Sequence, residues 1–510
     1  MSAALRPFLY GTAMMTGAAI MIVEILGAKM MAPFLGTSHF VWTAQIAVTM
    51  VALAIGYYAG GRFVDRSAEL NRLYWAILAA GIYLALSVPL TRPVAEACLK
   101  FDLAAGSLLA SAFLFLVPLG LLAMVGPFLI RVFTVNLSGM GGNVGRLSAI
   151  STLGSFVGTL LIGYVLIPLL PNSVTMYLTA AVLMAVSLGF LLWQRRAGGG
   201  RAAAVGLVAL AAGVGWPGVR GETWQGQSAV ELFRGNSNFG LLQVVQMTNS
   251  PLRYYLNDYL TQNTYDTNTG QSVSMFTYML HRLAKAYTPR TDDVLCIGVG
   301  VGIVPMDFAR EGARVDAVEI NPDVIPVARD FFGLDPARLN LALVDGRYFV
   351  HQTRRQYDAI CLDAFLGDSC PSHLMTREAF AAMAQRLKPD GVLVINTFAE
   401  VEYGNDFFGA SLLKTLSAVF PSVRIHHVPG RGNTIFVASP RRDLAILRPP
   451  RFDDIHPMAR ADVESAFASL LETDPTHGRV LTDDYNPVEF RDAANRERIR
   501  KNLALSMHGW

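Results

Sequence analysis

With 510 residues, the chain is long enough to hold more than one hydrophobic core. It is 52% hydrophobic and only 16% charged, whereas soluble domains carry about 25% charged residues, so the composition argues against a wholly soluble protein. The formal net charge of +3 gives no support for nucleic-acid binding, and we expect no nucleic-acid partner.

The charges are distributed unevenly along the chain. Residues 1–221 contain 13 Lys+Arg but only 5 Asp+Glu, and most of the charged residues follow later. A sparse, basic first part before a charge-rich second part predicts an all-α, multi-span membrane domain over 1–221 and a soluble domain behind it. The four cysteines have no metal-ligand spacing, so we expect neither disulfides nor a metal site.

Apolar stretches in the first part are long enough to cross a bilayer, which takes about 20 residues. The fourth stretch is too long for one upright helix, and Pro118 and Pro127 predict a kink or split because proline removes a helical hydrogen bond. Gly154, Gly158 and Gly163 suit close packing of helices in lipid. The predicted spans lie near 8–32, 40–61, 73–90, 103–133, 146–170, 173–193 and, less securely, 202–218.

The second part begins with alternating apolar and polar residues over 228–262, which predict a small β-meander assigned to 222–270. A helix is expected near 271–287. Strands then alternate with helices through 271–510, which predicts a mainly parallel, doubly wound α/β sheet of Rossmann-like type. The expected strands are Val294–Ile297, Arg314–Glu319, Asn340–Val344, Ala359–Asp363 and Val392–Thr397.

A glycine or an acidic residue stands at the carboxyl end of each of the first four strands. Glycine lets the backbone approach a ligand closely, and a carboxylate after the second strand can accept hydrogen bonds from ribose hydroxyls. One such feature is usually a turn or a helix cap, but four at one sheet edge predict a site for a nucleoside that bears a sulfonium. The residues are Gly298, Gly300, Gly302, Glu319, Asp345, Gly346 and Asp363.

The strings VLCIGVGVG, VDAVEINPDVI, LVDGRYFV, YDAICLDAF and LKPDGVLVINTF resemble the spermidine and spermine synthase family. That family has a methyltransferase-like fold and transfers an aminopropyl group from decarboxylated S-adenosylmethionine to an amine. The strings EILGAKMMAPFLGTSHFVWT, GYYAGGRFVDR and LTDDYNPVEF resemble bacterial membrane-fused spermidine synthase homologues. Together the resemblance covers nearly the whole chain.

The resemblance implies an aminopropyltransferase that acts on a putrescine-like amine and releases methylthioadenosine. Its co-substrate would be decarboxylated S-adenosylmethionine, with S-adenosylmethionine left open. The implied roles are a nucleoside loop for Gly298, Gly300 and Gly302, ribose binding for Glu319, adenine-side binding for Asp345, catalysis for Asp363 and nucleoside binding for Gln262.

Several positions depart from the family pattern. Val301 and Leu366 stand where the family has aspartates that contact the aminopropyl chain and the polyamine, and Phe276, Thr277 and Tyr278 replace a Tyr-Gln-Glu cluster. A pocket for a dication needs compensating carboxylates. Other candidates for the amine pocket, each of which also fits a structural role, are Asp266, His281, Asp368, His373, Asp483 and Asp484.

Two further functions stay open at this point. One is a membrane-tethered methyltransferase that uses S-adenosylmethionine, which the loss of an aspartate at Val301 favours. The other is a transporter or sensor with a regulatory nucleoside-binding domain. The expected partners are an amine and the lipid bilayer, with a homo-oligomer as an open alternative.

Basic residues cluster in the loops 62–72, 131–146 and 195–201, which the positive-inside rule assigns to the cytoplasm. Seven spans would then place the second part outside the cell, where S-adenosyl nucleosides are scarce. On chemical grounds we expect a multi-pass protein of the inner membrane with a cytoplasmic catalytic domain. Either 202–218 does not span or the split fourth segment changes the count.

Overall fold

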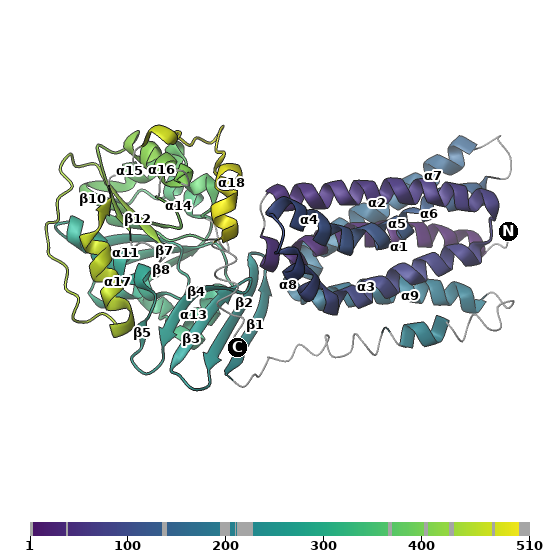
Figure 1. Ribbon diagram of the computed structural model, residues 1–510, viewed down its shortest axis with the longest axis horizontal. Coiled ribbons are helices and arrows are strands. Elements are labelled where there is room, and N and C mark those ends of the chain that lie inside the picture. The colour runs from purple at the N-terminus through teal and green to yellow at the C-terminus, as the bar shows by residue number, and fades with distance from the viewer. Residues whose placement is uncertain are drawn as a thin grey trace. The chain divides into compact units, whose positions relative to one another are not determined.

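The computed structural model describes residues 4–36, 39–134, 140–193, 204–209, 211, 228–365, 370–401, 406–427, 433–471 and 475–498. The chain forms two compact units, Met1–Glu222 and Thr223–Trp510. The first unit contains only helices in its described residues, and the second contains the strands as well (Figure 1).

Six helical segments of 22 to 31 residues in the first unit are long and apolar enough to cross a bilayer. They correspond to the first six predicted spans. The seventh prediction, 202–218, falls mostly outside the described residues. Within this range the structure describes 204–209 and 211, and these residues are helical. The segments are α1 (Leu5–Leu35), α2 (His39–Arg66), α3 (Leu70–Cys98), α4 to α6 (Leu103–Phe133), α7 to α8 (Met140–Leu169) and α9 (Asn172–Trp193).

Two of these segments contain a π-helical turn just before a proline. The turn η1 (Ala112–Leu116) precedes Pro118, and η2 (Ile162–Leu166) precedes Pro168. Proline has no N–H, so the carbonyl one turn earlier loses its usual helical partner, and a π turn re-pairs the backbone locally. A second interruption falls at Met124, between α5 (Val117–Ala123) and α6 (Val125–Phe133). The predicted interruption of the fourth span is confirmed.

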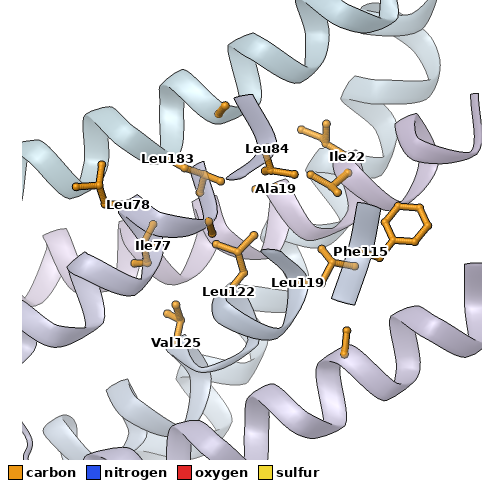
Figure 2. Close-up of a cluster of buried hydrophobic side chains, with 14 of the residues drawn as sticks. Ala19, Ile22, Ile77, Leu78, Leu84, Phe115, Leu119, Leu122, Val125 and Leu183 are labelled. Atoms are coloured by element: carbon orange, nitrogen blue, oxygen red, sulfur yellow. The ribbon is translucent and has the colours of Figure 1, made fainter. Parts of the chain in front are cut away.

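The helices of the first unit pack around a shared apolar core. Figure 2 shows Ile22 of α1, Leu84 of α3, Phe115 of η1, Leu119 of α5 and Leu183 of α9 among the buried side chains between these helices. All five side chains are buried. Such contacts stabilise the helical unit through close van der Waals packing.

Glycines allow α1 and α7 (Met140–Leu161) to approach closely. A Cβ atom on Gly154 would lie 2.0 Å from the carbonyl oxygen of Met14, and one on Gly158 would lie 2.6 Å from that of Ala18. A Cβ on Gly163 would meet no atom within 4 Å. Two of the three predicted packing glycines therefore belong to this contact, and Gly163 does not.

The second unit begins with the predicted β-meander, which is confirmed. Five antiparallel strands pair in chain order. The turn between the third and fourth strands places Asp258 and Tyr259 at φ +49° and +62°, the left-handed conformation that a two-residue type I′ hairpin turn requires at both positions. The strands are β1 (Ala229–Ser237), β2 (Gly240–Met247), β3 (Leu252–Asn257), β4 (Leu260–Asp266) and β5 (Gln271–Ser272).

An eight-stranded sheet follows in the order β13-β11-β12-β10-β9-β6-β7-β8. The stretch from β10 to β8 is parallel, and β12, β11 and β13 pair antiparallel at one edge. The predicted doubly wound sheet is therefore confirmed. The strands are β6 (Asp293–Ile297), β7 (Arg314–Glu319), β8 (Asn340–Leu343), β9 (Tyr357–Leu362), β10 (Leu387–Thr397), β11 (Ser422–His427), β12 (Thr434–Ser439) and β13 (Leu470–Leu471).

Helices cover both faces of this sheet. Cys296 and Cys361 point into a core with α11 (Met275–Tyr287), α12 (Ile303–Arg310) and α17 (Pro457–Ala468). Leu295 and Ile360, their neighbours along the strands, point into a core with α14 (Gly346–Gln352), α15 (Arg377–Arg386) and α16 (Phe407–Ser417). Burial on both faces explains why these strands are continuous apolar runs. The strand order reverses between β6 and β9, which is where open α/β sheets bind ligands.

We expect Gly154→Ala to lower the thermal unfolding midpoint of the full chain in detergent. The added methyl group overlaps the Met14 carbonyl, and overpacking of this kind costs about 1–3 kcal/mol. Gly163→Ala is the matched control, because it adds the same methyl group in open space. Equal midpoints for the two variants would contradict the proposed role of Gly154 in the α1–α7 contact.

Candidate functional site

A cavity of about 370 Å³ lies at the carboxyl edge of the parallel strands, within the size range of small-molecule sites. It includes the point where the strand order reverses between β6 and β9. Of the predicted nucleoside and catalytic residues, those that line it are Gln262, Gly298, Gly300, Glu319, Asp345, Gly346 and Asp363.

The three glycines after β6 have different functions in the loop. Gly298 adopts φ +90°, and a Cβ there would lie 2.2 Å from the carbonyl oxygen of Asp363. Gly302 adopts φ +85° at the start of α12, where a Cβ would meet Leu334 at 2.6 Å. Gly300 adopts φ +51° with no atom within 4 Å of a Cβ. Its missing side chain therefore leaves space in the cavity.

Glu319 holds the glycine loop through its carboxylate. Oε2 accepts hydrogen bonds from the N–H of Val299 at 3.0 Å and of Gly300 at 3.4 Å. Oε1 accepts from the N–H of Asn321 at 2.9 Å. Because each carboxylate oxygen has two lone pairs, Glu319 keeps acceptor capacity for hydroxyl groups of a bound ligand.

Asp345 is the N-cap of α14 and also pairs with a histidine. Its Oδ1 accepts from the N–H of Tyr348 at 2.9 Å, and its Oδ2 lies 2.9 Å from Nε2 of His373. Burial alone would raise the pKa of Asp345, but the hydrogen bonds from Tyr348 and His373 bring this pKa below its usual range. Asp345 is therefore ionised at neutral pH and acts as an acceptor.

Asp363 follows β9 directly, and its pKa shifts in the opposite direction from that of Asp345. Burial raises its pKa to about 6, a hydrogen bond from Asn396 works against this rise, and the negative charge of Glu319 adds to it. Asn396 Nδ2 donates to Asp363 Oδ1 at 2.8 Å, and Asn433 Nδ2 donates to Asn396 Oδ1 at 2.9 Å. Asn433 thereby orients the Asn396 amide with its NH₂ group toward Asp363.

Sequence reasoning missed Asn396 and Asn433. Asn396 lies at the end of β10, the fifth parallel strand, so the strand-end rule that pointed to Glu319 and Asp363 would have found it. Asn433 carries no such signal, because it reaches the site only through the antiparallel pairing of β12 with β10. Asp462 of α17 also lines the cavity without any local motif.

Aromatic side chains line the cavity beside the carboxylates. The rings of Phe365 and Phe398 lie 4.9 Å apart, and Phe239 and Phe276 also contribute. Apolar walls exclude water from a neighbouring carboxylate, and the loss of hydration favours its neutral form. This environment is consistent with the raised pKa of Asp363.

Asp266 and His281, two of the amine-pocket candidates, are buried outside the cavity lining. Asp266 is buried, accepts from the N–H groups of Asn268 and Thr269, and lies 3.1 Å from Nε2 of His456. His281 is buried, packs edge-on against Phe308 and lies 3.4 Å from Glu311. These contacts fit structural roles, a turn for Asp266 and helix packing for His281.

The remaining candidates differ in their positions. Asp483 binds Arg347 with both oxygens and accepts from Thr376 at 2.7 Å, and Arg347 lowers the pKa of Asp483 to about 2. Asp484 is exposed, and neither aspartate lines the cavity. Asp368 lies outside the described residues. His373 lines the cavity, beside Asp345.

Of the positions that depart from the family pattern, Leu366 lies outside the described residues, and Val301 and Tyr278 are engaged in packing. Val301 is buried with Leu242, Val244 and Val324 where the meander meets α13 (Val324–Phe332). The hydroxyl of Tyr278 donates to the carbonyl of Ser272 at 2.7 Å. The described loop therefore offers no carboxylate at position 301 to bind an amino group.

Residues 274–431 match the spermine/spermidine synthase domain. A polyamine aminopropyltransferase of Vibrio vulnificus is 37% identical over 119 residues, 22% of this chain and 40% of that protein. An N-terminal histidine N-methyltransferase of Emericella nidulans is 32% identical over 145 residues, 27% of this chain and 25% of that protein. The solved spermidine synthase of Thermotoga maritima aligns with TM-score 0.36 and 22% identity over 42% of this chain and 74% of that chain.

Residues 274–431 of the second unit thus match a spermine/spermidine synthase domain, and the unit has a Rossmann-like fold. The chain spans 40% and 25% of the lengths of the two relatives named above. The predicted resemblance is confirmed for this domain. Its extension to membrane-fused homologues, which rests on strings in both units, stays a prediction.

We expect Asp363→Asn to stabilise the chain at neutral pH. The pKa of Asp363, about 6, lies above the unfolded value of about 3.9. Its contribution to stability is therefore complete below about pH 4 and is lost as the pH rises through about 6. The Asp363→Asn variant has no carboxyl group to ionise at this position. It therefore avoids this loss of folding stability, which is no more than about 3 kcal/mol.

Thermal unfolding midpoints between pH 4 and pH 8 test this expectation. The midpoints of Asp363→Asn and the parent chain should agree near pH 4, diverge between about pH 4 and pH 6 and differ by a constant amount above that. Asp390→Asn, at an exposed position outside the cavity, is the matched control. Parallel curves for Asp363→Asn and the parent chain would show that the Asp363 pKa is not raised.

Proposed function

We propose that the second unit is an aminopropyltransferase that uses decarboxylated S-adenosylmethionine and a putrescine-like amine and releases methylthioadenosine. The observation that carries this proposal is Asp363, a carboxylate with a pKa of about 6 in the cavity of a domain that matches spermine/spermidine synthases. Acceptors for a nucleoside, Glu319 and Asp345, line the same cavity.

In the proposed complex, each strand end has a separate function. Glu319 accepts hydrogen bonds from the ribose hydroxyls, Asp345 lies on the side of the base, and the space at Gly300 admits the nucleoside. When bound, the sulfonium supplies a leaving group that already carries positive charge, so the departing sulfur needs no acid. The remaining requirement is to hold the amine nitrogen and the methylene carbon in line.

Asp363 is the group that we assign to proton removal. An alkylamine is an ammonium ion at neutral pH, with a pKa of about 10, and has no lone pair until it loses a proton. Asp363 orients the nitrogen and takes this proton, directly or through water. The nitrogen then forms its bond to carbon while the carbon–sulfur bond breaks and its electron pair stays on sulfur. Burial that raises the pKa of Asp363 makes this carboxylate a stronger base.

A second candidate function is methyl transfer from S-adenosylmethionine. The buried, apolar Val301 supports it, because no carboxylate at that position repels the carboxylate of the intact co-substrate. The similarity of part of the domain to a histidine N-methyltransferase is in line with this function. Methyl transfer releases S-adenosylhomocysteine, so the nucleoside product separates the two reactions.

For the first unit we propose a multi-pass position in the inner membrane. With the six apolar segments as spans, the helix ends and connections within 62–72 and 131–146 and the chain from residue 194 onward fall on one side. Their basic residues assign that side to the cytoplasm. An even number of spans then keeps the chain after residue 193 on the cytoplasmic side, provided that 202–218 does not cross.

We expect full-length protein in lipid nanodiscs to convert decarboxylated S-adenosylmethionine and an amine to methylthioadenosine, detected by mass spectrometry. Asp363→Asn should lower kcat by about 10²- to 10⁴-fold, the usual range for a general base, with little change in the Kd for methylthioadenosine. Asp390→Asn is the control with normal turnover.

The other outcomes of this assay have separate meanings. S-adenosylhomocysteine formed from S-adenosylmethionine would favour the methyltransferase. Nucleoside binding without either product would overturn both enzymatic proposals and favour a regulatory nucleoside-binding domain.

We expect Gly300→Ala to weaken methylthioadenosine binding, with Kd rising on the order of tenfold, because its methyl group enters the space left for the ligand. Gly312→Ala is the matched control. Gly312 also has a positive φ, +92°, and no atom within 4 Å of a Cβ, but it does not line the cavity. Equal losses of affinity in both variants would assign the effect to backbone strain and not to the site.

A further inference from the structure

Glu24 is an acidic residue in the interior of an apolar segment of the first unit. It lies about two turns from the nearer end of the span Leu5–Ala32, whereas the other acidic residues of 1–221 lie at the ends of spans or between them. Its side chain is partly buried and forms no hydrogen bond or ion pair with another described residue. Lys29, five residues further on, lies on a different side of α1. An ionisable group inside an apolar span is costly, which points to a functional role such as cation binding.

Buried polar groups without partners lie on the neighbouring helices α2 and α4, which contact each other and α1. Among the described residues, Nε2 of Gln45, Oγ1 of Thr49 and the hydroxyls of Ser107 and Ser111 have no hydrogen-bond partner. None of these four residues is more than 2% exposed. Several other hydroxyls of this unit donate to a carbonyl four residues earlier, those of Thr16, Thr91, Thr179 and Ser187. Because buried polar groups need partners, the four unpaired groups indicate a place for a polar ligand or water.

The contact between Gly27 and Phe115 shows how these residues face one another. A Cβ on Gly27 would lie 2.3 Å from an atom of the Phe115 ring. Glu24 precedes Gly27 by three residues and therefore lies on the same side of α1. Ser107 and Ser111 precede Phe115 by eight and four residues, on one side of α4 and η1. The first and fourth spans run in opposite directions, so the serines lie toward the start of α4 and Glu24 lies one turn beyond the ring.

The side of α2 that carries Gln45 and Thr49 faces the same span. A Cβ on Gly56 would lie 2.2 Å from the carbonyl oxygen of Gly120 in α5. Gln45 and Thr49 precede Gly56 by about three and two turns, on the same side of α2, where α2 contacts α4 and η1. The unpaired groups of both helices therefore form a polar path that runs along the fourth span toward the level of Glu24.

We propose that this path leads to a cation site at Glu24 and that the site binds a primary alkylammonium ion. An ammonium group has three N–H donors, which suit the carboxylate of Glu24 and the unpaired hydroxyls of Thr49 and Ser111. The face of an aromatic ring such as Phe115 also attracts an ammonium ion. Calcium, in contrast, takes about six or more oxygen ligands, and the described residues contain no cluster of His, Cys, Asp or Glu suited to a metal ion. The site belongs to the first unit and does not depend on the reaction proposed for the second.

Methanethiosulfonate reagents of opposite charge test the path and the site together. Full-length Ser111→Cys in lipid nanodiscs is treated with the aminoethyl reagent, a primary ammonium, or with the sulfonatoethyl reagent, an anion, and the modified peptide is quantified by mass spectrometry. Relative to free cysteine, the ammonium reagent should react at least about tenfold faster than the anion, because a carboxylate raises the local concentration of cations. Adding Glu24→Gln should remove this difference. Adding Asp65→Asn, at an exposed acid near the end of α2, is the matched control and should leave the difference unchanged.

Protection by a ligand tests the choice of ammonium. Butylammonium chloride at about ten times its Kd should slow the modification of Ser111→Cys on the order of tenfold, because the free site falls to about a tenth. Sodium chloride at the same concentration should not protect. Leu114→Cys, at a buried position of η1 outside the polar path, should stay unmodified. Thr49→Cys is a second reporter, used in place of Ser111→Cys if that variant lowers the thermal unfolding midpoint.

Four outcomes would overturn the proposal. No reaction at either reporter would show that water does not reach the path. Equal normalised rates for the two reagents, or a rate difference that persists with Glu24→Gln, would show that Glu24 attracts no cation. Equal protection by sodium would assign the site to a metal cation and not to an ammonium ion. Modification of Leu114→Cys as fast as that of Ser111→Cys would attribute the reaction to a general opening of the helices.

Discussion

The close approach of β6 and β9 at their carboxyl ends is the constraint on which the site depends. Gly298 packs so tightly against Asp363 that a Cβ would lie 2.2 Å from the Asp363 carbonyl oxygen. The N–H of Asp363 in turn donates to Ile297 at 2.9 Å. Because the chain leaves these two strands toward opposite faces of the sheet, a cavity opens between the loops. Glu319 then fixes the glycine loop from the neighbouring strand. The space for a ligand and the burial of the Asp363 carboxylate both result from the packing of β6 against β9 at their carboxyl ends.

Two carboxylates in one cavity acquire different properties from their surroundings. Asp345 caps a helix and pairs with His373, so its pKa falls, whereas burial raises the pKa of Asp363. An acid that stays ionised suits hydrogen-bond recognition, and an acid that titrates nearer neutrality suits proton transfer. The division of labour proposed for the site follows from this contrast.

The first unit is subject to a different constraint, because the backbone groups of its long apolar helices have to be paired within the helices. Its two π turns each precede a proline, at Pro118 and Pro168, so helices continue where a proline would otherwise end them. Gly154 and Gly158 let α7 approach the backbone of α1. Small residues thus permit close contact between these helices, and local re-pairing keeps each helix continuous.

Local pattern in the sequence determined the elements and much of the site. Apolar runs of strand length and helix length are readable without neighbours, and each parallel strand ends at the same sheet edge, so Gly298, Glu319, Asp345 and Asp363 could be assigned to one cavity in advance. Only the tertiary structure decided that His373 pairs with Asp345, that Asn433 reaches Asn396, and that Asp266 and His281 lie away from the cavity lining. These contacts join segments far apart in the chain, and they depend on strand order and helix packing, which no local periodicity encodes.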